Sequence, residues 1–203
     1  DFCLSRGLGD VYKRQHVYLS GADPDLSIGN FIADQVKGKS YATYPYAIQR
    51  GILLHRKIDD FTDRHPLFKK NVRLLFPTFR HYSRVIVDMF FDHFLATQWG
   101  EYHHQPLEQF ISDFYDLIDQ YPGTLPHKIN NMIPFLIDQN WFMDYSTVEG
   151  LEKILNQMSR RTQYPVERDR AVIDLKANYN DIKDDFNVFF ESLEKHVAEA
   201  VLK

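Results

Sequence analysis

Cysteine is nearly missing from this chain, because Cys3 is the only cysteine among its 203 residues. An intrachain disulfide and a metal site built on several thiolates are therefore excluded. No stretch approaches the roughly 18 consecutive apolar residues that a membrane-spanning helix needs. The N-terminal segment also lacks the apolar run of a secretory signal peptide. We therefore expect a cytoplasmic protein that has no membrane partner.

An excess of charge of either sign is missing too. The formal net charge is only −4, so the chain as a whole gives no argument for a nucleic-acid partner, although a local basic patch is compatible with it. Hydrophobic residues make up 44% and charged residues 26% of the chain, as in soluble globular proteins. A chain of this length can bury the core of one domain. The oligomeric state stays open.

Residues 1–15, DFCLSRGLGDVYKRQ, lack the apolar periodicity of a helix or a strand. They resemble translated cloning or adapter sequence, and the alternative is an ordinary flexible tail. We expect residues 1–15 to be a poorly packed, non-native or disordered tail and residues 16–203 to form the folded domain. Burial of Leu4 and Leu8 would contradict this expectation.

Proline and glycine divide the remaining chain into helices with few other breaks. Pro45 and Pro66 suit first turns, Gly38 suits a C-terminus, and Pro77 is expected to end a helix. The predicted helices cover residues 27–38, 44–63, 66–76, 83–99, 106–121, 126–138, 147–161 and 168–203. No segment shows convincing strand alternation. The expected fold is a single all-α domain in which the almost wholly apolar helix 83–99 is central and buried.

Two carboxylates in that apolar helix are the strongest chemical signal. Asp88 and Asp92 are four residues apart and therefore project from one face. An unpaired buried carboxylate would cost several kcal/mol, or would become neutral through a shifted pKa. A metal ion or a basic partner could compensate for this cost, and His93, which follows Asp92, could ligate the same ion.

The predicted helix 44–63 supplies a matching set. His55 and Asp59 are four residues apart, and Asp63 extends the stripe by another turn. Asp34, in the apolar run IGNFIAD, and His16 are further candidates. If the two helical faces meet, these side chains could converge on one or two ions of Mn²⁺, Mg²⁺, Fe²⁺ or Zn²⁺. The plain alternative is a set of solvated helix-surface pairs worth a few tenths of a kcal/mol each.

Basic residues flank the same helices, and most of them are expected to serve solubility. Arg56 and Lys57 lie beside His55 and could steady the charge of a phosphate. A basic rim could also steer an acidic partner. The basic set comprises Lys37, Lys39, Arg50, Arg56, Lys57, Lys69, Lys70, Arg73, Arg80 and Arg84.

Three blocks in order, GNFIAD (29–34), LLHRKIDDFTDRHP (53–66) and DMFFDHFLATQW (88–99), resemble the acyl carrier protein phosphodiesterase family. The likeness continues more weakly through QNWFMDY and LNQMSRR, and spans about residues 16 to 165. The family is regarded as a divergent, all-helical relative of the HD-domain metal phosphohydrolases. The resemblance therefore implies an HD-domain-like helical bundle and a phosphodiesterase-like domain at residues 16–203.

The resemblance also implies an activity and a set of site residues. Members hydrolyse the 4′-phosphopantetheine arm from holo acyl carrier protein, a step linked to fatty acid biosynthesis, with a divalent metal that is typically Mn²⁺; Mg²⁺ and Fe²⁺ are alternatives. On this basis we expect metal ligands at Asp34, His55, Asp59, Asp92 and His93, and catalytic roles for His55, Asp59 and Arg56. Additional candidates are His16, Asp88, Asp63 and Lys57.

Two other functions stay open at this point. One is a related enzyme that hydrolyses a nucleotide or another small phosphodiester, in an enclosed pocket with stacking aromatic residues. The other is a helical binding protein without catalysis, whose buried acids are satisfied by Arg and Lys and which binds no metal.

The N-terminal segment departs from the family pattern. The family's opening stretch reads Met-Asn-aromatic-Leu-Ala-His, whereas VYKRQ precedes His16 here. This departure puts the support of His16 in doubt.

Overall fold

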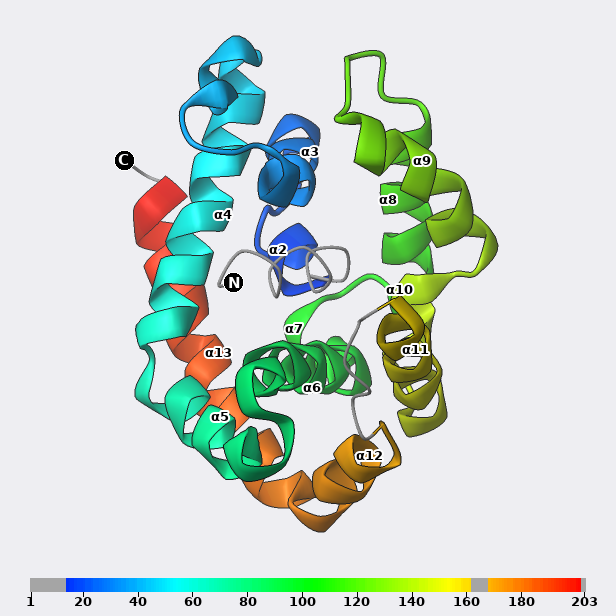
Figure 1. Cartoon of the computed structure of the whole chain (residues 1–203). Helices are drawn as coiled ribbons and strands as arrows, with labels where there is room; N and C mark the ends of the chain where they lie inside the picture. Colours follow the sequence, from blue (N-terminus) through cyan, green and yellow to red (C-terminus); the bar gives the residue numbers. More distant parts are fainter. Residues whose placement is uncertain (1–13, 162–167, 202–203) are drawn as a thin grey trace.

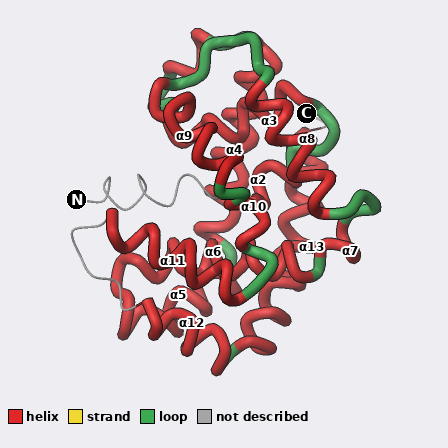
Figure 2. The backbone as a smooth tube through the Cα atoms, turned by 90° about the vertical axis from the view of Figure 1, so that its right-hand side faces the viewer, coloured by secondary structure: helices red, strands yellow, loops and turns green. Residues whose placement is uncertain are grey.

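A computed structural model describes residues 14–161 and 168–201 of the protein, apart from the side chains of residues 158–161, 168 and 169. Within these ranges all regular structure is helical and no strand occurs, which confirms the all-α expectation (Figures 1 and 2). The α-helices are α2 (Arg14–Tyr18), α3 (Pro24–Ile32), α4 (Tyr46–Arg64), α5 (Pro66–Phe79), α6 (Ser83–Thr97), α7 (Trp99–Tyr102), α8 (Leu107–Asp119), α9 (His127–Asp138), α10 (Trp141–Asp144), α11 (Val148–Arg161), α12 (Arg168–Ala177) and α13 (Tyr179–Val201).

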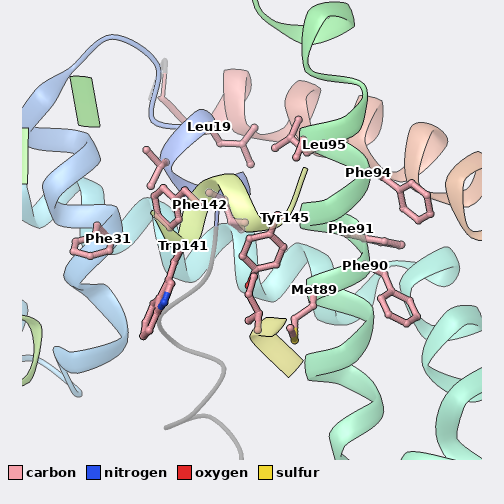
Figure 3. Packing of buried hydrophobic residues seen from close by; sticks show 14 of the residues in the cluster. Leu19, Phe31, Met89, Phe90, Phe91, Phe94, Leu95, Trp141, Phe142 and Tyr145 are labelled. Atoms are coloured by element: carbon pink, nitrogen blue, oxygen red, sulfur yellow. The ribbon is translucent and has the colours of Figure 1, made fainter. Parts of the chain in front are cut away.

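Helix α6 is the central element of the fold. It is buried on nearly every side, as the sequence predicts, and Figure 1 shows other helices around it. Figure 3 shows its side chains Met89, Phe90, Phe91, Phe94 and Leu95 in the packed interior. Burying an aromatic or aliphatic side chain of this size contributes ~1.5–3 kcal/mol. Helix α6 therefore supplies a large share of the core.

Phenylalanine rings join α6 to the last helix. The ring of Phe91 lies 4.9 Å from that of Phe189 and 5.4 Å from that of Phe186, measured between centroids. Helix α13 also packs along α4 and α5. The C-terminal helix thereby ties the first half of the chain to the central helix.

Helices α3 and α4 approach each other at two glycines. A Cβ atom on Gly29 would lie 2.2 Å from the carbonyl oxygen of Ile48, and one on Gly51 would lie 2.3 Å from that of Leu26. Real Cβ atoms do not approach backbone so closely, so only glycine permits this packing. The contact brings the backbone of α3 against the face of α4 that carries His55.

Helix α3 differs from the predicted helix 27–38. It begins earlier, at Pro24, because Asp23 caps it by accepting a hydrogen bond from the Leu26 backbone N–H. It ends at Ile32 and continues as a 3₁₀ turn, Ala33–Gln35. Asp34 therefore lies on the tighter turn that follows the helix.

Two further helix boundaries correct the prediction. Pro77 lies inside α5, because in the last turn it removes only one backbone donor, and the N–H of Arg80 still bonds to the carbonyl of Phe76. The predicted C-terminal helix 168–203 is divided at Asn178 into α12 and α13. The Asn178 side chain donates to the carbonyl of Asp174 and so closes α12.

The expected tail falls mostly outside the described residues, since these begin at Arg14, and Leu4 and Leu8 lie outside them. Its last two residues, Arg14 and Gln15, are part of helix α2 and are buried. Ordered structure therefore starts at least two residues before His16.

None of the helices in the described parts of the chain has both the length and the apolarity that crossing a membrane requires.

Candidate metal site

Four predicted residues from three segments meet at one place. The Nε2 atom of His55 lies 3.0 Å from Asp34 Oδ1 and 3.3 Å from Asp59 Oδ2. The Nε2 atom of His16 lies 3.4 Å from Asp59 Oδ1. The two imidazole rings lie 4.1 Å apart, measured between centroids. Helix α2, the turn after α3, and α4 thus bring two imidazoles and two carboxylates together.

Asn30 on α3 holds both imidazoles from behind. Its side-chain oxygen lies 3.0 Å from Nδ1 of His16 and 3.0 Å from Nδ1 of His55. Its side-chain nitrogen donates to the backbone carbonyl of His16 at 2.8 Å and to Ser20 Oγ at 3.0 Å. Because the His16 carbonyl can only accept, the orientation of the amide is fixed. The Asn30 oxygen must therefore be the acceptor for both rings.

This arrangement determines the tautomers of His16 and His55. Each ring donates from Nδ1 to Asn30, so each neutral ring carries its lone pair on Nε2. Both Nε2 atoms point to carboxylate oxygens, which are acceptors as well. Such a meeting of lone pairs is favourable only when positive charge lies among them, supplied by ring protons or by a bound cation. A second-shell oxygen that fixes Nδ1–H is the usual support of a metal-binding histidine.

The burial of the group is graded. His55 and His16 have side-chain exposures of only 4% and 7%, whereas Asp59 is 40% exposed. His16, His55 and Asp59 each offer a ligand atom, and these atoms lie within 4.8 Å of one another. The site is therefore deep on the histidine side and open to solvent at Asp59.

Asp92 does not join this group. Its carboxylate accepts hydrogen bonds from the backbone N–H groups of Arg14 and Gln15, at 3.3 and 3.0 Å, and from the Gln15 side chain at 3.2 Å. Burial raises the pKa of Asp92 to about 6, against the lowering effects of Arg14 and of these hydrogen bonds. Asp92 caps the N-terminus of α2, and it therefore helps to hold His16 in place through the backbone of this helix rather than by contact with the ring.

His93 also lies elsewhere. Its Nδ1 donates to the backbone carbonyl of Tyr145 at 2.8 Å, which leaves Nε2 to accept from the Tyr179 hydroxyl at 3.2 Å. Burial is the main cause that lowers its pKa and keeps the ring neutral. Both ring nitrogens have structural partners on the side of α10 and α13. The expectation that Asp92 and His93 share a cavity with His55 and Asp59 is not met.

The remaining candidates have other surroundings. Asp63 forms an ion pair with Arg84, and Asp88 is half-buried on α6, outside the metal-compatible group. Arg56 donates to the Val36 carbonyl at 2.9 Å, and its guanidinium lies 5.1 Å from the Tyr41 ring centroid. Arg56 thus secures the loop after Asp34. Lys57 is exposed and lies 3.5 Å from the carbonyl of Ala200.

An all-helical domain that brings two imidazoles and two carboxylates together beside a partly exposed aspartate has the features of a helical phosphodiester hydrolase, and comparison with known proteins identifies its family. The family model described as acyl carrier protein phosphodiesterase matches residues 15–193. The chain belongs to the acyl carrier protein phosphodiesterase family.

Individual relatives agree with this assignment. A protein of Enterobacter sp. (strain 638) named acyl carrier protein phosphodiesterase is 30% identical over 178 residues, which cover 86% of this chain and 91% of the relative. Relatives with the same name from Salmonella dublin and Salmonella newport (strain SL254) are each 30% identical over 194 residues, which cover 92% of this chain and 97% of the relative. No solved structure matches the chain.

Proposed function

We propose that this protein hydrolyses the phosphodiester that joins the 4′-phosphopantetheine arm to a serine of holo acyl carrier protein, at a divalent metal held by His16, His55 and Asp59. The observation that carries this proposal is the pair of Nε2 lone pairs that Asn30 aims at carboxylate oxygens. The names of the relatives support the substrate.

The donor set fits a borderline or hard divalent ion. Two imidazole nitrogens and carboxylate oxygens without thiolate suit Mn²⁺ and Fe²⁺, and they are also compatible with Mg²⁺ or Zn²⁺. Asp34, whose Oδ1 lies 3.0 Å from His55 Nε2, could serve as a further ligand. We favour Mn²⁺ on the basis of the family resemblance.

The chemistry divides between the ion and the residues of the chain. A bound divalent ion lowers the pKa of a water molecule and polarises phosphate oxygens. His16 and His55 present fixed lone pairs to it, and their Nδ1–H groups cannot leave Asn30 without losing buried hydrogen bonds. Asp59 is the most exposed of the three ligands, so it would hold the ion on the side open to solvent, and the leaving serine would take its proton from water on that side.

Arg56 takes a different role from the one predicted. Its guanidinium is occupied by the Val36 carbonyl and the Tyr41 ring, so we assign it to the positioning of the loop that follows Asp34. Lys57 points its ammonium group towards the end of α13 and has no assigned role at the phosphate.

The direct test is incubation with holo acyl carrier protein and Mn²⁺, followed by mass spectrometry of the carrier protein. We expect loss of the phosphopantetheine mass, abolition of the reaction by chelation, and its return on addition of Mn²⁺. His55→Ala should abolish turnover, while His104→Ala, which changes an exposed histidine, should not. Turnover that survives exhaustive chelation would exclude the metal. Turnover of nucleotide diesters but not of carrier protein would replace the substrate with the small-diester alternative.

A further inference from the structure

The segment from Pro66 to Arg84 differs in charge from the rest of the chain. It holds five Lys and Arg residues and no Asp or Glu, whereas the whole chain has a net charge of −4. Helix α5 forms most of this segment, and it starts directly after α4, which carries His55 and Asp59. A positive surface is thus placed next to the helix of the candidate site.

One face of α5 is committed to the interior. Phe68 and Leu75 are buried in the core. Lys70 forms an ion pair with Asp185 of α13 at 2.8 Å, and Asn71 donates to the same carboxylate at 3.0 Å. These contacts fix the rotation of α5 about its axis and leave its opposite face turned outward.

The outward face carries cations beside an exposed aromatic ring. Lys69, Arg73 and Phe76 follow each other at spacings of four and three residues, which places them in one stripe. All three are exposed, and within the described residues neither Lys69 nor Arg73 forms an ion pair. The guanidinium of Arg80 lies 5.8 Å from the centroid of the Phe76 ring and extends the stripe. We call these four residues the α5 stripe.

The two ends of the segment that carries the α5 stripe are tied to α4, the helix that carries His55 and Asp59. Asp63 is one helical turn beyond Asp59, and Arg84, which follows η3 (Arg80–Tyr82), forms an ion pair with Asp63. The proposed reaction breaks a bond at a serine on the surface of the carrier protein, so that surface has to come against the rim of the site. Helix α5 directly follows α4 in the chain, so its basic face is the one we assign to this partner surface.

We propose that the α5 stripe is the docking surface for the acidic face of acyl carrier protein. Lys69, Arg73 and Arg80 contact carboxylates of the carrier protein, and Phe76 contacts an apolar residue that lies between those carboxylates. This inference rests on the proposed function and specifies its partner surface. Charge complementarity of this kind mainly accelerates encounter and fixes orientation, and its effect falls as salt rises. The stripe is positive in a chain whose net charge is −4, and its charge is therefore complementary to that of an acidic partner.

The test compares a charge-reversed stripe with a matched control in two assays. Lys69→Glu/Arg73→Glu is measured with holo acyl carrier protein and with bis(4-nitrophenyl) phosphate, both in Mn²⁺. Arg73→Glu alone is compared with Lys128→Glu, which makes the same change of charge on exposed α9, away from α5 in both views (Figures 1 and 2). We expect kcat/KM for carrier protein to fall at least tenfold in the double variant at low salt. Most of this fall should be a rise in KM, while the small diester and the control stay within twofold of the unmodified protein.

The outcomes separate the docking surface from the proposed function. An unchanged kcat/KM of the double variant for carrier protein overturns the docking surface and leaves the function standing. If the unmodified protein hydrolyses neither substrate, the proposed function fails, and docking is decided by titration calorimetry with apo carrier protein. Weaker binding of Arg73→Glu than of Lys128→Glu then supports the stripe, and equal binding overturns it. Stripe-dependent binding of an oligonucleotide, with none of carrier protein, also overturns it.

Discussion

Replacing Arg14 with leucine should stabilise the protein. Arg14 is fully buried, and among the described residues no group accepts a hydrogen bond from any nitrogen of its guanidinium. The guanidinium lies 5.2 Å from the centroid of the Tyr145 ring and 6.0 Å from that of Phe142. A charged group without hydrogen bonds in such surroundings is one of the costliest arrangements in a protein interior.

The size of the effect follows from the same surroundings. Burial lowers the pKa of Arg14 to about 10, although the carboxylate of Asp92 acts in the opposite direction. Each pKa unit is worth ~1.4 kcal/mol, so this fall corresponds to a penalty on the order of 3 kcal/mol at neutral pH. This penalty already includes the attraction of Asp92, and the smaller leucine leaves part of the space of the arginine unfilled, which offsets part of the gain. We expect Arg14→Leu to raise the free energy of unfolding by about 2 kcal/mol.

Thermal and urea denaturation measure this prediction. For a chain of this size the expected gain corresponds to a rise in Tm of about 4–8 °C. Lys176→Leu, which replaces an exposed cation on α12, should stay within ~0.5 kcal/mol of the unmodified protein. A lower Tm for Arg14→Leu would show that the Tyr145 contact and the attraction of Asp92 outweigh desolvation, and would refute the reasoning.

Three further predictions concern other parts of the structure. Asn30→Ala should lower the affinity for Mn²⁺ by about 10–100-fold in titration calorimetry, because His16 loses the side-chain oxygen that fixes its tautomer, while His55 keeps only the backbone carbonyl of residue 30 as acceptor for Nδ1; unchanged affinity would contradict that role. Gly51→Ala should cost at least ~2 kcal/mol in urea denaturation, because its Cβ would meet the Leu26 carbonyl, whereas Gly100→Ala, which meets nothing within 4 Å, should be neutral or stabilising; equal effects would count against the close contact. The raised pKa of Asp92 means that the folded state binds its proton more tightly, so this group stabilises the fold at low pH and loses that contribution as pH rises through about 6. Asp92→Asn should remove the corresponding fall in the free energy of unfolding when unfolding is measured at a series of pH values. If the fall persists in Asp92→Asn, another group causes it.

The sequence predicts the long elements and names all four residues that meet at the candidate site, but helical spacing alone brings together only His55 and Asp59. Helix α4 is recognisable because its apolar residues recur at helical spacing and Pro45 marks its start, and α6 is recognisable because it is apolar on nearly every side. His55 and Asp59 are recognisable as a pair because one helix places them on the same face. Nothing in their spacing shows that Asp34 meets them, since it lies on a short 3₁₀ turn whose direction depends on packing.

The hydrogen-bond partners of Asp92 explain why the sequence-based prediction placed it at the metal site. A buried acid in an apolar helix does need compensation, but here the backbone of α2 provides it. Helix α2 has only five residues, too few for a periodic pattern, so the sequence gives no sign that its N–H groups point at α6. His93 follows Asp92 in the chain and yet faces Tyr145 and Tyr179 on another side. Asn30 was missed because an amide has no metal-ligand signature, although its spacing of four residues from Asp34 could have placed it beside the site.

The glycine contact between α3 and α4 has a consequence for how such a protein can diverge. The segment from α3 to the end of α4 contains Asn30, Asp34, His55 and Asp59, and only His16 comes from elsewhere. Its two helices are held by backbone touching backbone, which does not depend on the size of neighbouring side chains. Outer helices such as α5, α9 and α12 can therefore exchange surface residues, and with them partners, while the reactive groups keep their mutual geometry. The same independence makes this helical pair a self-contained unit for transplantation into another helical scaffold, with one histidine to be supplied by the host.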